Sequence, residues 1–339
     1  MKRFFIVFLA ACALFFQCSA LHATSLIDMF STLSGENDAK YKVQFVEGDK
    51  EAADEVLLIK LKGIIHETDE SDYSPFEFKK DMLETLNKDI ETAIERPSVK
   101  AVLIEIDSPG GEVTASDIIY HRLQKINKSD KAKKPVVAIF GTLGASGAYY
   151  AACAADQIWA HPTSIIGSIG VIMQTANLEK LAQMIGYRHI SLKSDRTPKK
   201  DILSPFREMT PEEKSMLMSL IDGMYDRFVG IVAVSRKKTK DEIVKIADGG
   251  IYTSDQALKN GLIDGIGYRE DAFDKAKELA GVKSAKLVKR KIKKGFAELL
   301  SEITEMRSGV PSMISAFREI LNSADTPTML YQLKTSPSK

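Results

Sequence analysis

Three apolar runs, each followed by a turn and a helical pattern, constrain the fold of this chain most strongly. They are Val56–Ile65, Val99–Asp107 and Pro135–Phe140. Each is rich in Val, Ile and Leu over its whole length, which is typical of a strand buried on both faces. Amphipathic helical patterns over Phe76–Glu95 and Val113–Ile126 separate the runs. Strands that alternate with helices predict an α/β fold with a largely parallel sheet.

The C-terminal half of the sequence changes from short strands to helices. Gln157–Ala160 and Ile165–Met173 are short apolar runs. Pro211 suits the first turn of a long helix because it has no N–H that needs a partner. The predicted helices are Pro211–Lys237, Asp241–Ala247, Ser254–Asn260 and Glu270–Ala280.

The first residues have the pattern of an export signal. Lys2 and Arg3 precede the apolar run Phe4–Phe16, and the small residues after Cys18 resemble a cleavage site. This pattern predicts a signal peptide over residues 1–23. The apolar run is short for a membrane span, which takes about 20 residues. A retained membrane anchor and a lipid-modified Cys18 are the alternatives.

The overall composition points to no particular partner and argues against an internal disulfide. The 339 residues are 44% hydrophobic and 27% charged, with a net charge of +1, which favours neither nucleic acid nor an anionic membrane. Of the three cysteines, only Cys153 would remain after removal of the leader. The exported chain would then have no internal disulfide and would depend on its hydrophobic core.

A basic cluster lies near the C-terminal end. Seven of the twelve residues from Lys283 to Lys294 are Lys or Arg. A solvated tail or helix face is the favoured interpretation, ahead of nucleic-acid binding. Contact with anionic lipid is a further alternative.

Ser146 stands out in the segment GTLGASGAYYAACAAD because its neighbours are too small for ordinary core packing. It follows the strand Pro135–Phe140 and precedes a helical pattern over Ala148–Ala155. A helix N-terminus favours developing negative charge, so a nucleophilic serine is often placed there. Serine is also a favoured N-cap. On this segment alone, both interpretations stay open.

A nucleophilic serine needs a base, and the histidines are poor candidates. The four histidines after the leader lie in no recognisable motif, and each fits a surface or core role: His66, His121, His161 and His189. A desolvated lysine is the remaining type of base, since its neutral amine accepts the proton of the serine.

Four segments in order resemble the bacterial signal peptide peptidase A family. They are DSPGG, GASGAYYAACAAD, IIGSIGV and KDILSPFREMTPEE, and the resemblance covers residues 55 to 280. It implies repeated ββα units of the Clp/crotonase type with a helical C-terminal part. It also implies an exported serine peptidase with a Ser/Lys dyad and no metal or cofactor.

The resemblance assigns the catalytic residues. Ser146 matches the nucleophile and Lys200 matches the general base. Lys199 is the alternative base, because a shift of one residue in the alignment would exchange the two. Gly110, Gly111 and Gly147 match the oxyanion hole, where the missing Cβ lets a backbone N–H approach a substrate carbonyl.

Ser168, in the segment GSIGV, matches a hydroxyl that orients the lysine amine. A hydroxyl that satisfies a buried backbone group is the alternative for this residue.

The residue pattern and the resemblance together predict the domains. They are a leader or anchor over 1–23, a polar linker over 24–53, a peptidase domain over 54–282, where the resemblance lies, and a basic extension over 283–339. The resemblance also implies substrates and location. Remnant signal peptides are the implied substrates, and a homo-oligomer, an octamer, is the implied assembly. The implied location is the bacterial inner membrane and periplasm, or the extracytoplasmic face of the cell membrane. A Clp-like Ser-His-Asp protease and a catalytically inactive scaffold of the same fold are the alternatives.

Overall fold

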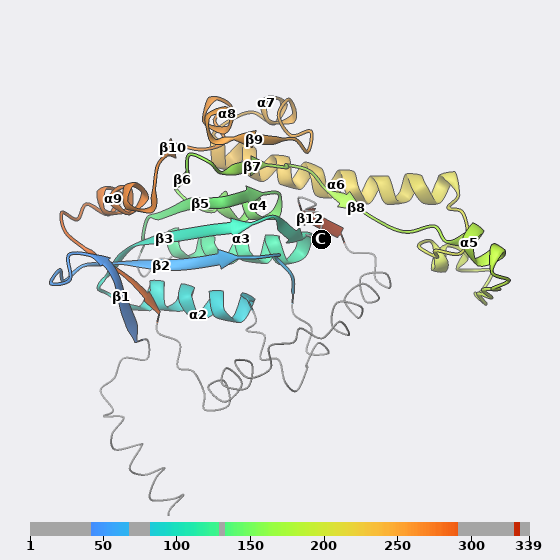
Figure 1. Cartoon of the computed structure of the whole chain (residues 1–339), viewed down its shortest axis with the longest axis horizontal. Helices are drawn as coiled ribbons and strands as arrows, with labels where there is room; N and C mark the ends of the chain where they lie inside the picture. The colour runs from blue at the N-terminus through green and yellow to red at the C-terminus, as the bar shows by residue number, and fades with distance from the viewer. Residues whose placement is uncertain (1–41, 68–81, 129–132, 291–328, 333–339) are drawn as a thin grey trace, which may run out of the picture. The chain divides into compact units, whose positions relative to one another are not determined.

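The computed structural model describes residues 42–67, 82–128, 133–290 and 329–332 (Figure 1). The predicted leader over 1–23 lies outside these residues. The main sheet runs in the order β1-β11-β2-β3-β5-β6-β10, with β7 beside β5 and β9 beside β7. The strands are β1 (Val43–Gly48), β11 (Lys286–Arg290), β2 (Glu55–Lys62), β3 (Val99–Ser108), β5 (Val136–Ala145), β6 (Gln157–Ala160), β10 (Gly265–Ile266), β7 (Ile165–Gly167) and β9 (Ile251–Thr253).

The centre of the sheet is parallel, as predicted. β2 pairs with β3, β3 with β5 and β5 with β6, all in the parallel sense. Helices α2 (Met82–Glu95), α3 (Val113–Asn127) and α4 (Gly147–Ala152) contribute to the apolar cluster on one face, and α9 (Arg269–Ala280) to that on the other. The unit strand–strand–helix occurs as β1–β2–α2 and again as β3–β4–α3, where β4 is Gly110–Glu112. The α/β prediction is confirmed.

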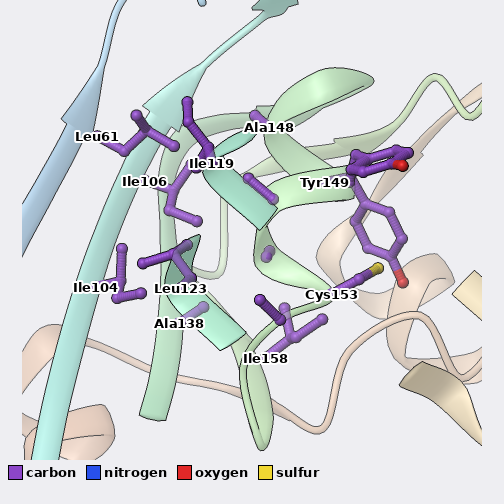
Figure 2. Packing of buried hydrophobic residues seen from close by; sticks show 14 of the residues in the cluster. Leu61, Ile104, Ile106, Ile119, Leu123, Ala138, Ala148, Tyr149, Cys153 and Ile158 are labelled. Carbon is purple, nitrogen blue, oxygen red and sulfur yellow. The ribbon is translucent and has the colours of Figure 1, made fainter. Parts of the chain in front are cut away.

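The core explains why these strands are apolar along their whole length. On β3, Ile104 and Ile106 face the cluster formed with α3 and α4, whereas Leu103 faces the α9 side. Figure 2 shows Ile119 and Leu123 of α3 packed beside the strand residues. Because both faces are covered, successive side chains are buried and the run has no polar alternation.

Two strands of the sheet lie outside the range 54–282 predicted for the domain. β1 belongs to the segment expected as a linker, and it pairs antiparallel with β11 from the segment expected as a basic extension. β11 in turn pairs parallel with β2. Part of the cluster Lys283–Lys294 therefore forms the strand β11, in which Leu287 and Val288 are buried between the basic side chains.

The C-terminal part is helical. α6 (Pro211–Arg236) begins with a capping box between Thr210 and Glu213, as its sequence favours. The other helical elements are α5 (Glu179–Met184), the 3₁₀ turn η2 (Pro198–Asp201), α7 (Lys240–Val244) and α8 (Ser254–Lys259). No helix within the described residues is long and apolar enough to span a bilayer.

α6 is buried over only part of its length. Phe228 and Val232, in its C-terminal half, are fully buried, and the Phe228 ring lies 5.0 Å from that of Tyr150 in α4. Met216 and Met218, in the N-terminal half, are about half exposed. This half of α6 lies near α5 at one end of the drawing, away from β3 and β5 (Figure 1).

The buried side chain of Lys134 caps the C-terminal end of α2 and leads to a prediction for how stability changes with pH. Lys134 donates to the carbonyls of Ala93, Ile94 and Arg96, and burial lowers its pKa from 10.5 to about 8. Between these values the unfolded chain binds the proton and the folded chain releases it. The unfolding free energy should therefore rise with pH in this window, by at most about 1.4 kcal/mol per pH unit. Urea unfolding from pH 7 to 10.5 measures this rise, which a Lys134→Met variant should lack. Parallel curves for the two proteins would contradict the prediction.

Candidate active site

Ser146 occupies a strained turn between β5 and α4. β5 continues to Ala145, beyond its predicted end at Phe140, and α4 begins at Gly147, so one residue connects strand and helix. Ser146 has φ 54° and ψ −119° and is 1% exposed. A residue other than glycine adopts a positive φ at a cost of about 1 to 3 kcal/mol. Its side chain makes no capping hydrogen bond to α4. The N-cap interpretation therefore does not explain Ser146.

The surrounding chain holds this turn in place. The Ser146 N–H donates to the carbonyl of Gly167 at 2.7 Å, and the Ser146 carbonyl accepts from Tyr150 N at 2.9 Å. The hydroxyl of Tyr149 donates to the Leu262 carbonyl at 2.6 Å. α4 is buried along its whole length, so these bonds anchor the turn in the core. A buried, anchored turn can maintain the strained conformation of Ser146.

Ser168 lies beside Ser146 because two parallel strands end in register. Ala145 of β5 pairs with Gly167 of β7, and a serine follows each of them. Ser168 also has a positive φ, 51°, and is 9% exposed. Its N–H donates to the carbonyl of Gly250 at 2.7 Å. The structure therefore brings the two predicted serines to one edge of the sheet.

Gly110 and Gly111 form the first part of β4. Gly110 has φ 90°, and its N–H donates to the hydroxyl of Ser108 at 3.1 Å. A Cβ on Gly111 would lie 1.8 Å from the Ile65 carbonyl oxygen, so only glycine fits there. Gly110, Gly111 and Gly147 are all candidates for oxyanion donors, and the first two lie in one short strand. Gly147 begins α4, where helix geometry leaves N–H groups without helical partners.

A strand from the C-terminal region lies beside β4. The backbone of β12 (Met329–Gln332) pairs antiparallel with β4 and with β8 (Ile172–Met173), so these three strands form a second sheet. In the register, Tyr331 is opposite Gly111. The edges of β4 and β8 therefore accept an extended chain next to a predicted oxyanion glycine.

Lys200 is not brought to Ser146 within one chain. It is exposed in η2, as is Lys199, and no hydrogen bond within the described part of the chain joins it to Ser146. Its turn is linked to the start of α6 through Arg207, which forms ion pairs with Asp201 of η2 and with Glu213 of α6. Glu213 precedes Phe228 by about 22 Å along the helix axis. The base predicted from the sequence therefore lies on a part of the chain that extends from the core.

The histidines do not form a triad with Ser146. His161 contacts Thr163 and the ring of Tyr268. His189 stacks on Phe206, and His121 is exposed on α3. Among the described residues, no histidine is hydrogen-bonded to Ser146. No three His, Cys, Asp or Glu side chains of the described ranges gather as a metal site requires.

Comparisons with known proteins agree with a peptidase. The model of peptidase family S49 matches residues 128–283, which include Ser146, Ser168 and Lys200. A putative signal peptide peptidase SppA of Enterococcus faecium is 33% identical over 312 residues, 89% of this chain and 88% of that protein. A putative protease of Synechocystis is 44% identical over 189 residues, 56% of this chain and 66% of that protein. Among solved structures, a ClpP1 mutant from Listeria monocytogenes matches with a TM-score of 0.40 and 16% identity, over 63% of this chain and 93% of that one.

The buried serine at a strand-to-helix turn, together with these relatives, defines the class as serine peptidase. Within that class, the chain belongs to peptidase family S49, the family of signal peptide peptidase A.

Sequence reasoning missed two features of the site. One is β12 beside β4, for which the residues 329–332 give no recognisable signal. The other is the ionic network that connects Asp201, Arg207 and Glu213. The run SPFREMTPEE contains the last two of these residues, but their pairing is visible only in the folded chain.

Proposed function

We propose that this chain is an endopeptidase that degrades remnant signal peptides at the membrane surface, with Ser146 as nucleophile and Lys200 as general base. The observation that carries the proposal is the strained conformation of Ser146, buried at the N-terminus of α4 with no capping bond. Such a turn presents a hydroxyl to a reacting carbonyl, next to helix amides that favour negative charge.

The strand pairing beside Ser146 supports a peptide substrate. The backbone of β12 pairs with β4 and β8, and an extended substrate that takes the place of β12 can pair with the same two edges. Backbone pairing does not depend on the side chains of the substrate, so it suits substrates of varied sequence. An apolar signal peptide remnant is such a substrate, in line with the name of the Enterococcus relative. Small or aliphatic side chains are expected at the positions next to the cleaved bond.

The proposed chemistry uses residues of the protein alone. The neutral amine of Lys200 takes the proton of Ser146 as the hydroxyl oxygen attacks the peptide carbonyl. Amides of Gly111 and Gly147 stabilise the oxyanion. The lysine ammonium then protonates the leaving amine, which gives an acyl-enzyme. The same lysine then deprotonates a water molecule that attacks the ester carbonyl, the bond from the carbonyl carbon to the Ser146 oxygen breaks, and the lysine ammonium returns the proton to that oxygen. In this mechanism, the hydroxyl of Ser168, next to Ser146, orients the amine of Lys200.

The choice between the adjacent lysines is tested by substitution. Lys200→Ala should lower kcat on the order of 10³-fold or more, because the acyl transfer then lacks its base. Lys199→Ala is the matched control, since it removes the same charge from the neighbouring residue, and should keep activity within about 3-fold. Hydrolysis of a fluorogenic signal-peptide fragment measures both. Loss of activity only in Lys199→Ala would transfer the assignment to that residue.

A dyad completed between two copies of the chain reconciles the buried Ser146 with the exposed Lys200. Co-expressed Ser146→Ala and Lys200→Ala chains, each inactive alone, should then regain roughly a quarter of the activity, because random pairing gives that share of complete sites. The measurement uses two affinity tags to purify mixed oligomers. An inactive mixed oligomer would contradict the shared dyad. The octameric assembly is tested separately by light scattering of the full chain.

A further inference from the structure

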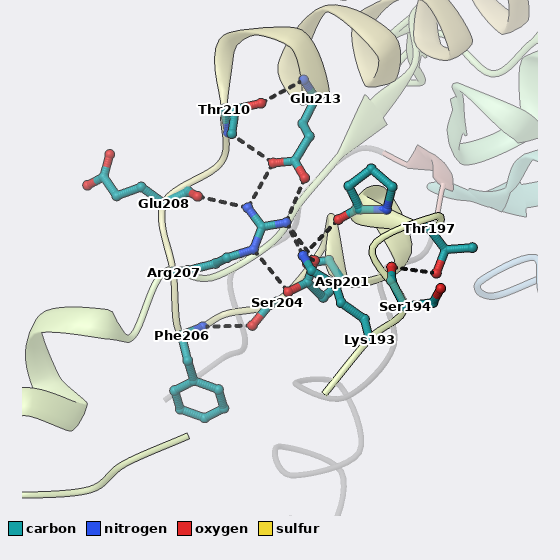
Figure 3. A network of polar contacts seen from close by, with 11 residues as sticks. Lys193, Ser194, Thr197, Asp201, Ser204, Phe206, Arg207, Glu208, Thr210 and Glu213 are labelled. Carbon is teal, nitrogen blue, oxygen red and sulfur yellow. Dashed lines mark hydrogen bonds and ion pairs between the residues drawn. The ribbon is translucent and has the colours of Figure 1, made fainter. Parts of the chain in front are cut away.

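The turn that carries Lys200 is held by charged groups. Every residue from Ser191 to Lys200 is exposed, so η2 has little apolar packing to hold it. Instead, Lys193, Asp201, Arg207 and Glu213 form one network of ion pairs (Figure 3). Asp201 is the last residue of η2 and directly follows Lys200. A contact that holds Asp201 therefore also sets the position of the Lys200 backbone.

Arg207 connects this turn to the start of α6. Its guanidinium donates to both carboxylate oxygens of Asp201, at 2.9 and 3.3 Å, and to the Asp201 backbone carbonyl at 3.0 Å. It also donates to both carboxylate oxygens of Glu213, at 2.6 and 2.8 Å, and to the Glu208 carbonyl at 3.0 Å. A planar guanidinium can make two such bidentate contacts at once, whereas an ammonium group cannot.

Both partners of Arg207 are themselves held. Glu213 belongs to the capping box of α6, where its carboxylate accepts from the Thr210 N–H at 3.0 Å. On the other side, Lys193 donates to Asp201 and to the Pro198 carbonyl, which spans the two ends of η2. The turn is thus attached to the end of a helix of 26 residues.

The network also neutralises a carboxylate next to the proposed base. Hydrogen bonds from Arg207 and Lys193 hold the pKa of Asp201 well below its usual range. Arg207 and the Thr210 backbone lower the pKa of Glu213 to about 2. The charged groups around Asp201 are Lys193 before the turn, Arg207 after it and Glu213 on α6, while Glu208 contributes only its backbone carbonyl to Arg207. An unpaired Asp201 would instead favour a protonated amine on Lys200.

We propose that Arg207 is a positioning residue for the general base: it attaches the Lys200 turn to α6 and keeps Asp201 from pairing with the Lys200 amine. This role rests on the proposed function. It acts through Lys200 and requires no contact of Arg207 with the substrate.

Arg207→Met tests the proposal. It should lower kcat about 100-fold, because the amine is displaced by the order of 1 Å, and change KM less than 3-fold. Asp201 then keeps Lys193 as an ion-pair partner but loses Arg207, so its carboxylate can also stabilise the ammonium form of Lys200, and a higher pH is needed to obtain the neutral amine. On the acidic side of the pH profile of kcat/KM, called the acid limb here, activity should therefore appear at a pH about 1 unit higher. Arg207→Lys keeps the positive charge but not the planar guanidinium that makes both bidentate contacts. This variant should have the wild-type pH profile but only part of the wild-type kcat.

Asp201→Asn separates positioning from charge. Added to Arg207→Met, it removes the released carboxylate, so the acid limb should return to its wild-type position while kcat stays low. Alone, it keeps the Arg207–Glu213 pair, and it should lower kcat about 10-fold without raising the acid limb. The single variant also tests the proposal if Arg207→Met fails to fold.

Arg269→Met is the matched control, because Arg269 also bridges two carboxylates, those of Glu47 and Glu105. It should leave the pH profile unchanged. An unshifted acid limb in Arg207→Met, or unchanged kcat in Asp201→Asn, would overturn the proposal. Failure of the proposed function is recognised separately, by activity that survives in Lys200→Ala.

Discussion

Ser146→Ala is expected to lower peptide hydrolysis by a factor on the order of 10⁴ or more, because it removes the hydroxyl that forms the acyl-enzyme in the proposed mechanism. Substrate binding should persist, since it uses the backbone edges of β4 and β8. The measurement is single-turnover cleavage of a fluorogenic peptide, with binding followed by fluorescence anisotropy. Wild-type rates in this variant would exclude Ser146 as the nucleophile.

Ser146→Gly serves as a second, independent test of the same turn. It is expected to be equally inactive, yet its unfolding free energy should exceed that of Ser146→Ala by about 1 to 2 kcal/mol. The reason is that φ 54° with ψ −119° is strained for a residue with a Cβ and open to glycine. Thermal unfolding of the two variants gives the comparison. Equal stabilities would mean that the turn is unstrained or that it relaxes in the variants.

The sheet could be predicted from sequence where its strands are buried on both faces. β2, β3 and β5 have long apolar runs because helices cover each side, and those runs were recognisable. β1 and β11 escaped recognition for the opposite reason. β1 is an edge strand with half-exposed side chains, and β11 has two buried residues among basic ones. Their pairing joins segments more than 230 residues apart, which local patterns do not reveal.

The sequence predicts the site residues best where they directly follow the end of a strand. Ser146 and Ser168 each lie one residue beyond a parallel strand. The motifs assigned both residues to the site, and the structure adds that they share one edge of the sheet. Lys200 is different, because no strand or core contact fixes it. Its position depends on Arg207, which bridges carboxylates that lie six residues away in each direction. A motif can assign such a lysine a role, but its place in space requires the folded chain.

The second large effect is expected from Gly111→Ala. A Cβ at this position would lie 1.8 Å from the Ile65 carbonyl oxygen, and 2.6 Å from its carbon. Backbone atoms cannot rotate away as a side chain can, so β4 must move relative to the end of β2. Unfolding free energy should fall by about 3 kcal/mol, and kcat about 100-fold, because an oxyanion donor moves with β4. Urea unfolding and peptide hydrolysis measure the two effects.

Gly223→Ala is the control for the added methyl group. Gly223 lies inside α6, and a Cβ there would meet no atom within 4 Å. Alanine should therefore raise the unfolding free energy by about 0.5 to 1 kcal/mol, from helix propensity alone. A lower unfolding free energy in Gly111→Ala together with a higher one in Gly223→Ala would show that the loss at Gly111 comes from the nearby Ile65 backbone. The general flexibility of glycine would not explain it. If Gly111→Ala instead kept both stability and kcat, β4 would not be held against Ile65, and the oxyanion role would pass to Gly147.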